Sequence, residues 1–364
     1  MRPKVYSVAI EVTAHCQQKC DYCYNAWRED NGAGMEAGAQ KKLHARVEKV
    51  LSAIEVDHVT ITGGEPFARK DIFELLDLVR AQKVGIQIIS NGGLIDDAIA
   101  TRLAPYQVSY VQCTLDGPNA ELHDAHVGGK GHFDKTIAGI AAMKRAGVPV
   151  VGCTVITRKN AARLGEIIAL FRSLGVRHMA LSRFSPAGYA ARHAAELLPS
   201  RDDLLVAFRQ AIPFAKLADD PMRFTCTMPV PPCAVEVEEL APLEFGTCAI
   251  GTKYQEFALG PDGRLRHCTL HGSALGGDRD VLETDVAAIV TGSEVRDYKR
   301  TLPEFCAGCS HASSCGGGCG AASEWVLGAR DVPDPFVWQH VDDEFGARLE
   351  HERKKKPIRL EVIR

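Results

Sequence analysis

The sequence predicts an α/β fold in two parts, a parallel sheet covered by helices and a smaller cysteine-rich region with a β-hairpin. Through residues 1–200, short apolar or β-branched runs alternate with stretches in which apolar residues recur at helical spacing. Such alternation produces a parallel sheet whose strands are joined by right-handed crossovers. Cysteines then gather between Cys248 and Cys319, around a sequence typical of a β-hairpin.

Each expected strand or helix is a short patterned run between polar or turn-forming residues. The six strands are Val5–Thr13, His58–Thr62, Gly85–Ser90, Ser109–Leu115, Val148–Thr157 and Val176–Phe184, and the helices between them are Lys42–Ile54, Asp71–Lys83, Asp96–Leu103, Phe133–Ala146 and Ala161–Leu174. The turn Gly-Pro-Asp-Gly at 260–263 is expected to join two further strands, Gln255–Leu259 and Arg264–His267.

The expected domain boundaries follow changes in composition. Residues 201–245 bridge the two parts through one amphipathic helix, Asp202–Lys216, and a proline-rich stretch that ends at Cys233. Residues 246–345 form the cysteine-rich domain, and residues 346–364 form a basic tail. Such a tail is either a solvated helix face or a docking site for an acidic partner.

Composition points to a globular protein of the cytoplasm. The 43 basic and 46 acidic residues nearly balance, so we expect no nucleic-acid partner. No run of about 18 apolar residues occurs, and the N-terminus lacks the apolar core of a signal peptide, so we expect no membrane partner either. Thirteen cysteines in a reducing compartment indicate metal ligation instead of disulfides.

Three cysteines lie close together directly after the first strand. They are Cys16, Cys20 and Cys23, with Tyr22 just before the last of them. Three thiolates leave one corner of a zinc site or of an iron-sulfur cube without a protein ligand. The alternatives are buried structural thiols, or a zinc site completed by His15 or by a distant residue.

A Gly-Gly-Glu-Pro motif, Gly63, Gly64, Glu65 and Pro66, ends the second strand. Glycines let the chain pass close to a ligand, and proline fixes the turn into the next helix. By itself the motif is an ordinary strand-to-helix turn. Its distance from the cysteine triplet makes the pair of motifs specific.

The triplet and this motif together resemble the radical S-adenosylmethionine (SAM) superfamily. The resemblance implies a [4Fe-4S] cluster on Cys16, Cys20 and Cys23, whose free iron chelates SAM and cleaves it to a 5′-deoxyadenosyl radical. It implies that residues 63–66 hold the SAM amino group and that Tyr22 lies beside the cofactor. The six strand–helix units are similar to the partial (β/α)6 TIM-like barrel of that superfamily, which has a lateral mouth.

Two more strands end in residues that the resemblance places at the site, because barrels of this type use the carboxyl ends of their strands. Ser90 and Asn91 are similar to residues near SAM, the alternative being a turn into a helix. By the same resemblance, Thr114 and Lys135 would contact the SAM carboxylate. Asp116 would project toward the substrate, as a general base or as a turn-capping acid.

The second cysteine group resembles the SPASM domain, a twitch-like fold that carries auxiliary iron-sulfur clusters. Its cysteines are Cys248, Cys268, Cys306, Cys309, Cys315 and Cys319. The superfamily's topology assigns Cys248, Cys268 and Cys319 to a first cluster and the other three to a second. Zinc ribbons share the spacing of two residues between cysteines, so a zinc site is the alternative.

The SPASM pattern has seven cysteines and ends with one after the position of Cys319. This chain departs from it, because no cysteine follows Cys319. The second cluster is then one ligand short, unless His340, Asp334 or Asp331 completes it, or one iron stays open, or the cluster is absent. Cys233 is expected to supply a fourth ligand to the first cluster, the alternative being a buried thiol.

The resemblance implies an enzyme that modifies ribosomally made peptides, with reduced flavodoxin or ferredoxin as electron donor. Because the first strand starts by Val5, we expect a peptide to need a separate leader-recognition protein or to dock directly. The alternatives are radical SAM chemistry on a small molecule or tetrapyrrole, and a non-catalytic iron-sulfur carrier. Arg183, at the end of the last strand, is either a substrate contact or a surface arginine.

Overall fold

One sheet of ten strands organises the part of the chain that this computed structural model describes, residues 2–29, 38–298 and 302–339. The strand order is β10-β9-β1-β2-β3-β4-β5-β6-β7-β8. The strands are β1 Lys4–Glu11, β2 Glu55–Thr62, β3 Gly85–Ser90, β4 Tyr110–Thr114, β5 Val150–Ile156, β6 His178–Arg183, β7 Arg223–Cys226, β8 Glu244–Phe245, β9 Glu256–Leu259 and β10 Leu265–Arg266. Neighbours from β9 to β8 pair in parallel, whereas β10 pairs antiparallel with β9.

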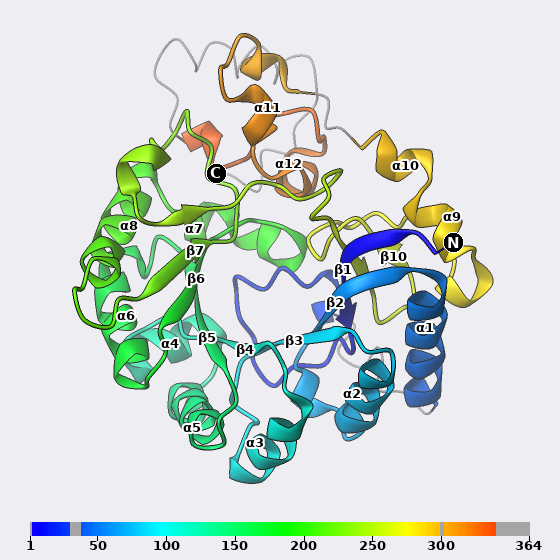
Figure 1. Ribbon diagram of the computed structural model, residues 1–364. Helices are drawn as coiled ribbons and strands as arrows, with labels where there is room; N and C mark the ends of the chain where they lie inside the picture. The colour runs from blue at the N-terminus through cyan, green and yellow to red at the C-terminus, as the bar shows by residue number, and fades with distance from the viewer. Residues whose placement is uncertain (1, 30–37, 299–301, 340–364) are drawn as a thin grey trace.

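The sheet curves into the partial barrel that the sequence predicts. Figure 1 shows the strands arranged around a central space, with the helices outside them. Among the described residues the outermost strands, β10 and β8, do not pair with each other, so the barrel stays open. The six expected parallel strands are β1 to β6, and β3 has the predicted bounds.

Helices connect successive strands and cover the outside of the sheet. They are α1 Ala39–Ala53, α2 Ile72–Ala81, α3 Asp97–Leu103, α4 Ala120–Val127, α5 His132–Arg145, α6 Leu164–Ser173, α7 Ala194–Leu197, α8 Arg201–Ala215, α9 Val286–Val290, α10 Ser293–Arg296, α11 Ala312–Cys315 and α12 Gly320–Leu327. The predicted helices α1, α2, α3, α5, α6 and α8 occur with ends shifted by at most three residues.

Helix α4 is one that the sequence analysis does not predict. Its buried face carries His123 and His126 next to Val127, so hydrophobic periodicity does not reveal it. The Asn119 side chain caps its first turn by accepting a hydrogen bond from the Leu122 N–H at 3.0 Å. The helix therefore depends on capping and on buried polar contacts more than on an apolar stripe.

The sheet extends beyond the six expected strands on both sides. Strand β7, from the bridging segment, pairs in parallel with β6. Strand β9 pairs in parallel with β1 and sets Phe257 beside Val8. The hairpin expected in the cysteine-rich domain therefore lies in the barrel sheet, where it covers an edge that β1 would otherwise expose.

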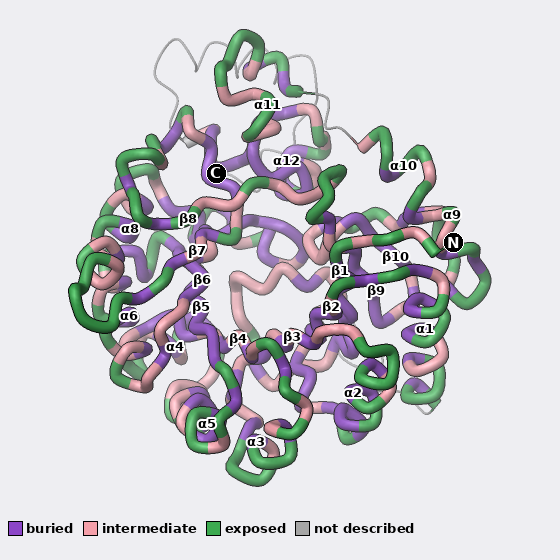
Figure 2. The backbone as a smooth tube through the Cα atoms, viewed as in Figure 1, coloured by how far each residue is buried: buried purple, intermediate pink, exposed green. Residues whose placement is uncertain are grey.

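Apolar side chains from the strands, the hairpin and the surrounding helices form a continuous core. Figure 2 shows β5 and β6 as largely buried, as expected for parallel strands that are covered on both faces. A smaller apolar cluster packs α12 and the chain after it against the segment that follows β6; its members are Ala191, Ala194, Val326, Leu327 and Val332. The C-terminal part is thus seated at the carboxyl end of the barrel strands.

Candidate functional site

The cysteine loop, residues 16–23, begins against the turn that follows β2. The Gly64 N–H donates to the Thr13 carbonyl at 2.6 Å. The Glu65 N–H donates to the His15 carbonyl at 2.8 Å. A Cβ at Gly64 would lie 2.0 Å from the His15 carbonyl oxygen, and Gly63 has a φ of +130°. Both positions therefore require glycine, and the close approach that they allow sets the cysteine loop beside the end of β2.

The three thiols of this loop are partly buried and lie close enough together for their charges to interact. Burial raises the pKa of Cys20 well above its usual value, and the neighbouring Cys23 and Cys16 raise it further. Burial and the Glu65 charge raise the pKa of Cys16 to about 12. Thiolates at such positions need a positively charged partner, and a metal centre supplies one. The three residues fit an iron-sulfur cluster in this respect.

Glu65 is completely buried and ties the end of β2 to the end of β3. Its Oε1 accepts hydrogen bonds from the Phe67 N–H at 3.1 Å and from the Ser90 hydroxyl at 2.8 Å. Its Oε2 accepts one from the Asn91 N–H at 2.8 Å. Burial raises the pKa of Glu65 to about 7, although these three donors oppose the rise. Pro66 begins the short 3-10 helix that supplies the Phe67 donor.

Asn91 connects the turn after β3 to the cysteine loop. Its Oδ1 accepts hydrogen bonds from the Gln17 amide at 2.8 Å and from the Gly93 N–H at 2.9 Å. Its Nδ2 donates to the Cys16 thiol at 3.7 Å. The structure therefore brings together four residues that the sequence assigns to one site, which are Cys16, Glu65, Ser90 and Asn91.

Asp116 follows β4 and is completely buried. Its Oδ1 accepts a hydrogen bond from the Val155 N–H at 2.8 Å, and the Asn160 side chain donates to its carbonyl at 3.1 Å. Burial raises the pKa of Asp116 to about 6, while His126 and the Tyr22 hydroxyl oppose the rise. Asp116 thus stabilises the connection between β4 and β5, and its pKa also suits proton exchange near neutral pH.

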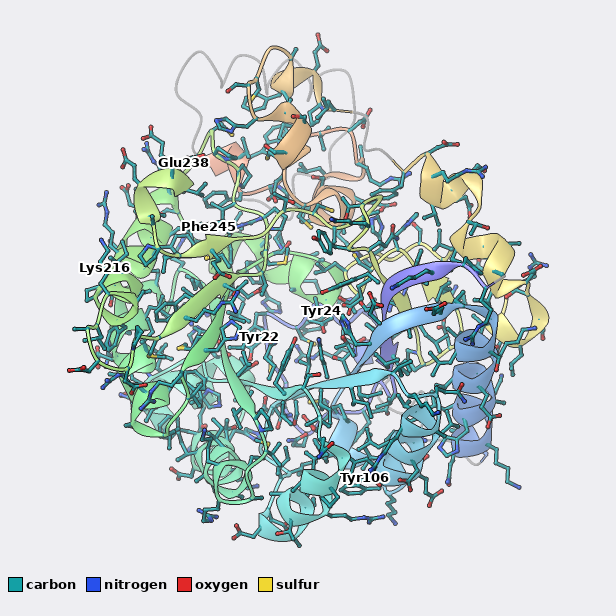
Figure 3. The ribbon with its side chains drawn as sticks, in the orientation of Figure 1. Tyr22, Tyr24, Tyr106, Lys216, Glu238 and Phe245 are labelled. Atoms are coloured by element: carbon teal, nitrogen blue, oxygen red, sulfur yellow. The ribbon has the colours of Figure 1, made fainter. Side chains whose placement is uncertain are left out.

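Tyr22, within the cysteine loop, lies close to Asp116. Its pKa is raised well above the usual value by burial and by the nearby charges of Asp116 and Cys20. Figure 3 places Tyr22 within the ring of strands, together with Tyr24. Tyr22 is thus close both to a cysteine of the loop and to the carboxyl group of Asp116.

Thr114 and Lys135 occupy different surroundings from the four residues around Glu65. The Thr114 hydroxyl bonds the Cys153 thiol and opposes the rise in its pKa. Lys135 is exposed on the first turn of α5, where its Cβ would be 3.7 Å from a Cβ at Gly93. Lys135 therefore lies at the rim of the site, beside the turn after β3.

Two arginines that the sequence analysis does not single out stabilise the cysteine loop and the strand before it. The Arg28 guanidinium donates to the Cys20 carbonyl and lies 3.7 Å from the centre of the Tyr189 ring. Arg266, buried in the hairpin, forms an ion pair with Glu11 at the end of β1. Most of these partners are far apart in the sequence, so no motif or spacing reveals them.

Cys248, Cys268 and Cys319, here called the first thiol group, come together as the sequence analysis expects. Burial raises the pKa of Cys268 to about 12, and the charges of Cys319 and Cys248 raise it further. The Cys319 N–H donates to Asp334 at 2.8 Å, and its thiol accepts from the Ala322 N–H at 3.5 Å at the start of α12.

Cys233, Cys306, Cys309 and Cys315, here called the second thiol group, line one cavity of about 510 Å³. The residue Cys233 is exposed as a whole, but the atoms around its thiol exclude water and raise the pKa of the thiol to about 12, with the charges of the other three cysteines acting in the same direction. The structure thus corrects the expectation that Cys233 joins the first thiol group. A turn that starts at Pro231 sets Cys233 beside the segment of residues 306–315, so four cysteines line this cavity where the sequence analysis expects three.

The other candidate residues of the C-terminal part have different surroundings from those expected. Arg183 and Asp334 form a completely buried ion pair with a distance of 2.7 Å. Arg183 also donates to the Pro229 carbonyl at 2.9 Å, so it is neither a surface arginine nor exposed to substrate. Asp331 lines a different cavity from the second thiol group. His340 and the basic tail lie outside the described residues.

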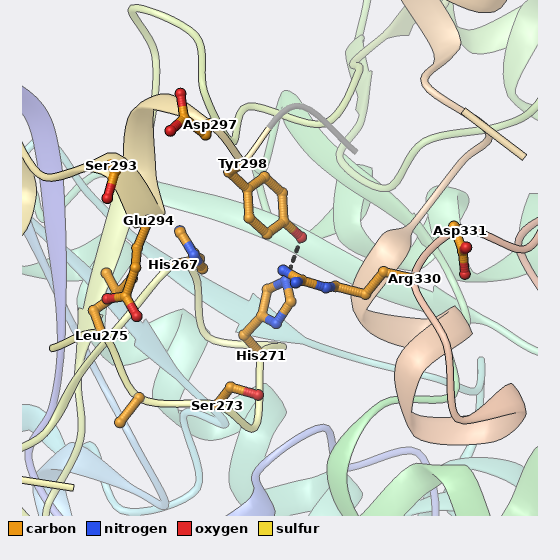
Figure 4. Close-up of a pocket in the computed structure, with 11 residues that line it drawn as sticks. His267, His271, Ser273, Leu275, Ser293, Glu294, Asp297, Tyr298, Arg330 and Asp331 are labelled. Atoms are coloured by element: carbon orange, nitrogen blue, oxygen red, sulfur yellow. Dashed lines mark hydrogen bonds between the residues drawn. The ribbon is translucent and has the colours of Figure 1, made fainter. Parts of the chain in front are cut away.

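The cavity that includes Asp331 has a volume of about 530 Å³ and is lined by His267, His271, Tyr298 and Arg330, among others (Figure 4). It lies beside the first thiol group, whose charges act on Tyr298. The Tyr298 hydroxyl and the His271 ring share a hydrogen bond, and His271 Nδ1 lies 3.2 Å from Glu324. Burial and the nearby Cys268 charge raise the pKa of Tyr298. Burial lowers the pKa of His267, another lining residue, to about 4, so its ring is neutral at pH 7.

No helix in the described part of the chain is long and apolar enough to cross a membrane. Within residues 2–29, 38–298 and 302–339, no three His, Cys, Asp or Glu side chains are arranged to hold one metal ion. The ligands of an iron-sulfur cluster surround several irons, so they need not converge on one point.

Comparison with known families gives one match, over residues 10–171, to the model described as the Radical SAM superfamily. This range contains the cysteine loop, the Gly-Gly-Glu-Pro turn and the strands β2 to β5.

Similar proteins share most of the length of this chain. The mycofactocin maturase MftC of Mycobacterium tuberculosis (strain ATCC 25618 / H37Rv) is 28% identical over 347 residues, which cover 94% of this chain and 85% of that protein. A PqqA peptide cyclase of Granulibacter bethesdensis is 25% identical over 329 residues, which cover 89% of this chain and 85% of that protein. The crystal structure of Streptococcus suis SuiB bound to precursor peptide SuiA shares the fold, with a TM-score of 0.69 at 18% identity. The match covers 91% of this chain and 75% of SuiB.

Proposed function

We propose that this chain, which belongs to the radical SAM superfamily through residues 10–171, is an enzyme that modifies a ribosomally made peptide. Similarity to a mycofactocin maturase and to a PqqA peptide cyclase supports a peptide as the substrate. The observation that carries the proposal is the position of the three thiols of Cys16, Cys20 and Cys23 at the carboxyl ends of the strands, beside Glu65. With a [4Fe-4S] cluster and SAM bound there, reductive cleavage supplies a 5′-deoxyadenosyl radical that takes a hydrogen atom from the substrate.

Glu65 is proposed to hold the SAM amino group. Two donors occupy its Oε1, but its Oε2 accepts only the Asn91 N–H among the described residues. Because a carboxylate has about four acceptor sites, Oε2 has room for an ammonium group. A bound ammonium would favour the ionised form of Glu65, whose pKa burial raises to about 7. Gly63 and Gly64 allow the backbone to approach the same ligand, and Pro66 fixes the turn.

The remaining barrel residues are proposed to contact the other end of SAM and the substrate. Thr114 and the rim residue Lys135 are assigned to the SAM carboxylate, and Ser90 and Asn91 are assigned to the side of SAM that faces β3. Asp116 is proposed to exchange a proton with the substrate, since its pKa of about 6 lies near neutral pH. Tyr22 lies beside that carboxyl group and orients it.

The two C-terminal thiol groups are proposed to hold auxiliary iron-sulfur clusters that exchange electrons with the substrate. Their thiols are gathered in two separate places, and burial raises the pKa of members of both groups. We further propose that the protein acts in the cytoplasm with reduced flavodoxin or ferredoxin as its electron donor. A separate leader-recognition protein is the proposed partner for presenting the peptide.

The proposal is tested with reconstituted protein, SAM, dithionite and each short peptide that is encoded near this gene. We expect 5′-deoxyadenosine and a changed peptide mass, and both should disappear when Cys16, Cys20 and Cys23 are replaced by alanine. Cys226→Ala is the control, because this thiol is buried in β7 and should leave both products unchanged. Absence of 5′-deoxyadenosine from the wild-type protein would refute the proposal. If the protein cleaves SAM but changes a small molecule or tetrapyrrole and not the peptide, the substrate belongs to the alternative class.

A further inference from the structure

We propose that Cys233 is the fourth thiolate ligand of an auxiliary cluster bound by Cys306, Cys309 and Cys315, and that this site is therefore closed. The inference rests on the proposed function, in which the C-terminal thiols bind iron-sulfur clusters. It assigns a ligand from the segment before the hairpin to a site whose other ligands come more than seventy residues later. The first thiol group then keeps three cysteines and one position without a thiolate.

The cavity of the second thiol group is the first observation in favour. All four thiols line the same space of about 510 Å³, and the charges of the other three cysteines act on Cys233. Much of the remaining lining is apolar, with Phe305, Pro333 and Val337 among it. Four cysteines complete the ligand set of an iron-sulfur cube.

The turn that carries Cys233 is rigid and anchored. The N–H groups of Ala234 and Val235 both donate to the Pro231 carbonyl, at 3.0 and 3.1 Å. Pro231 and Pro232 fix their own φ angles, and Val235 is completely buried in the core. Cys233 is therefore presented to the cavity by a backbone with little conformational freedom.

A buried ion pair holds that turn against the segment of residues 306–318. Arg183 donates to the Pro229 carbonyl at 2.9 Å and binds Asp334 at 2.7 Å. The Asp334 N–H in turn donates to the carbonyl of Gly317, two residues after the last cysteine of the cavity, at 3.1 Å. Arg183 thus connects the chain before Cys233 to the loop that supplies the other ligands.

The segment of residues 306–318 is also built to stabilise an anionic sulfur. The N–H groups of Gly317 and Gly318 donate to the Cys315 thiol, and these glycines have φ angles of +77° and +84°. Backbone donors of this kind stabilise thiolate ligands and tune the potential of a cluster. Such donors would have little to stabilise if Cys315 were an inert buried thiol.

Two other side chains need to be excluded as the fourth ligand. Cys226 is 1% exposed within β7 and faces the barrel core, away from the cavity. His311 does line the cavity, between the second and third cysteines of the loop, and is the rival ligand. The test therefore needs variants of Cys233, His311 and Cys226.

The experiment uses the full chain with Cys16, Cys20 and Cys23 replaced by alanine, so that the C-terminal iron is measured alone. In this background, Cys233→Ala, His311→Ala and Cys226→Ala are reconstituted and compared by iron and sulfide counting, Mössbauer spectroscopy and EPR. We expect about eight irons per chain in the background. Cys233→Ala should lose one to four of them and alter the spectrum of one cluster, whereas His311→Ala and Cys226→Ala should change neither. A small external thiol should restore the Cys233→Ala spectrum, because Cys233 is exposed at the cavity mouth.

Several results would overturn the inference. An unchanged spectrum in Cys233→Ala, or the loss of iron in His311→Ala instead, would assign the fourth position to another ligand. Failure of Cys233→Ala to fold, without rescue by the external thiol, would show a structural role. No iron in the background variant would remove the C-terminal clusters altogether. The proposed SAM chemistry is judged separately, by 5′-deoxyadenosine from the chain with its barrel cysteines intact.

Discussion

The barrel site and the second thiol group hold their cysteines in opposite surroundings. In the barrel site the Cys16 thiol lies among polar groups, with Asn91, Gln17 and the Glu65 carboxylate close by. The four thiols of the second group lie among prolines, glycines and Phe305. A site with three thiolates keeps one position for another ligand, whereas a site with four is closed. Ligand number and lining together thus distinguish the two sites, in line with the proposal that the first cleaves SAM and the second transfers electrons.

The first thiol group stands between these two. It has three cysteines, like the barrel site, but it belongs to the C-terminal part of the chain. A cavity with polar lining residues, Tyr298 and His271 among them, lies beside it. By ligand number alone, this group belongs with the barrel site.

Replacing Arg183 with methionine should give the largest effect, and it separates the two regions. The change leaves Asp334 charged and buried, and removing one partner of a buried ion pair costs about 3–5 kcal/mol. We expect the C-terminal iron to fall while the barrel cluster still cleaves SAM, as measured by iron counting and 5′-deoxyadenosine. Arg177→Met is the control, since its exposed pair with Asp220 contributes about 0–1 kcal/mol. Full iron in Arg183→Met would contradict the role of the ion pair.

Replacing Glu65 with alanine should produce the next largest effect, confined to the barrel. The donors of Phe67, Ser90 and Asn91 lose their acceptor, at a cost of about 1–3 kcal/mol for each buried group left unpaired. We expect a lower melting temperature and SAM affinity reduced at least about tenfold, by calorimetry, since a charge-assisted contact contributes about 1.5–3 kcal/mol. Glu48→Ala, on the exposed face of α1, should change neither. Unchanged SAM affinity in Glu65→Ala would show that SAM binds elsewhere.

Replacing Thr114 with valine should have a smaller effect that is limited to SAM. The proposed contact with the SAM carboxylate is worth about 1–2 kcal/mol, which corresponds to a loss of affinity of about tenfold. The protein should keep its melting temperature within a few degrees, because valine has a similar shape and Thr114 is only half buried. Thr101→Val, on the exposed surface of α3, is the matched control. Equal SAM affinities for both variants would remove Thr114 from the site.

The pH dependence of stability should distinguish the buried Glu65 carboxyl from an ordinary one. Its pKa rises from 4.5 to about 7 on folding, so the folded chain binds this proton more tightly than the unfolded chain. The stabilisation is complete below pH 4.5 and is lost as the pH rises to about 7, at up to about 1.4 kcal/mol per pH unit. Unfolding without SAM, compared between wild type and Glu65→Gln, measures this slope. Parallel pH profiles for the two proteins would contradict the raised pKa.

The sequence predicts those features that local patterns encode. The parallel strands follow from alternating apolar runs, and the glycines at 63 and 64 follow from a turn that must approach the backbone at His15. The first thiol group also comes together as its resemblance implies. The strands and the glycines are encoded in short segments, whereas the grouping of the three cysteines follows from the resemblance to a known domain.

Features that depend on contacts between distant segments could not be predicted from the sequence. The placement of Cys233 depends on the Pro231 turn and on the buried pair of Arg183 with Asp334, residues 151 positions apart. Helix α4 escapes because its buried face carries two histidines. The parallel pairing of β9 with β1 escapes because a hairpin motif does not say which strand it will join.

Production of 5′-deoxyadenosine by two complementary variants tests most directly the division between a barrel site that cleaves SAM and C-terminal sites that do not. One variant replaces Cys16, Cys20 and Cys23 with alanine, and the other replaces Cys306, Cys309 and Cys315. The first should form no 5′-deoxyadenosine while it keeps its C-terminal iron, and the second should still cleave SAM but leave the peptide unchanged. Continued cleavage by the first variant, or loss of cleavage by the second with its barrel iron intact, would contradict the account.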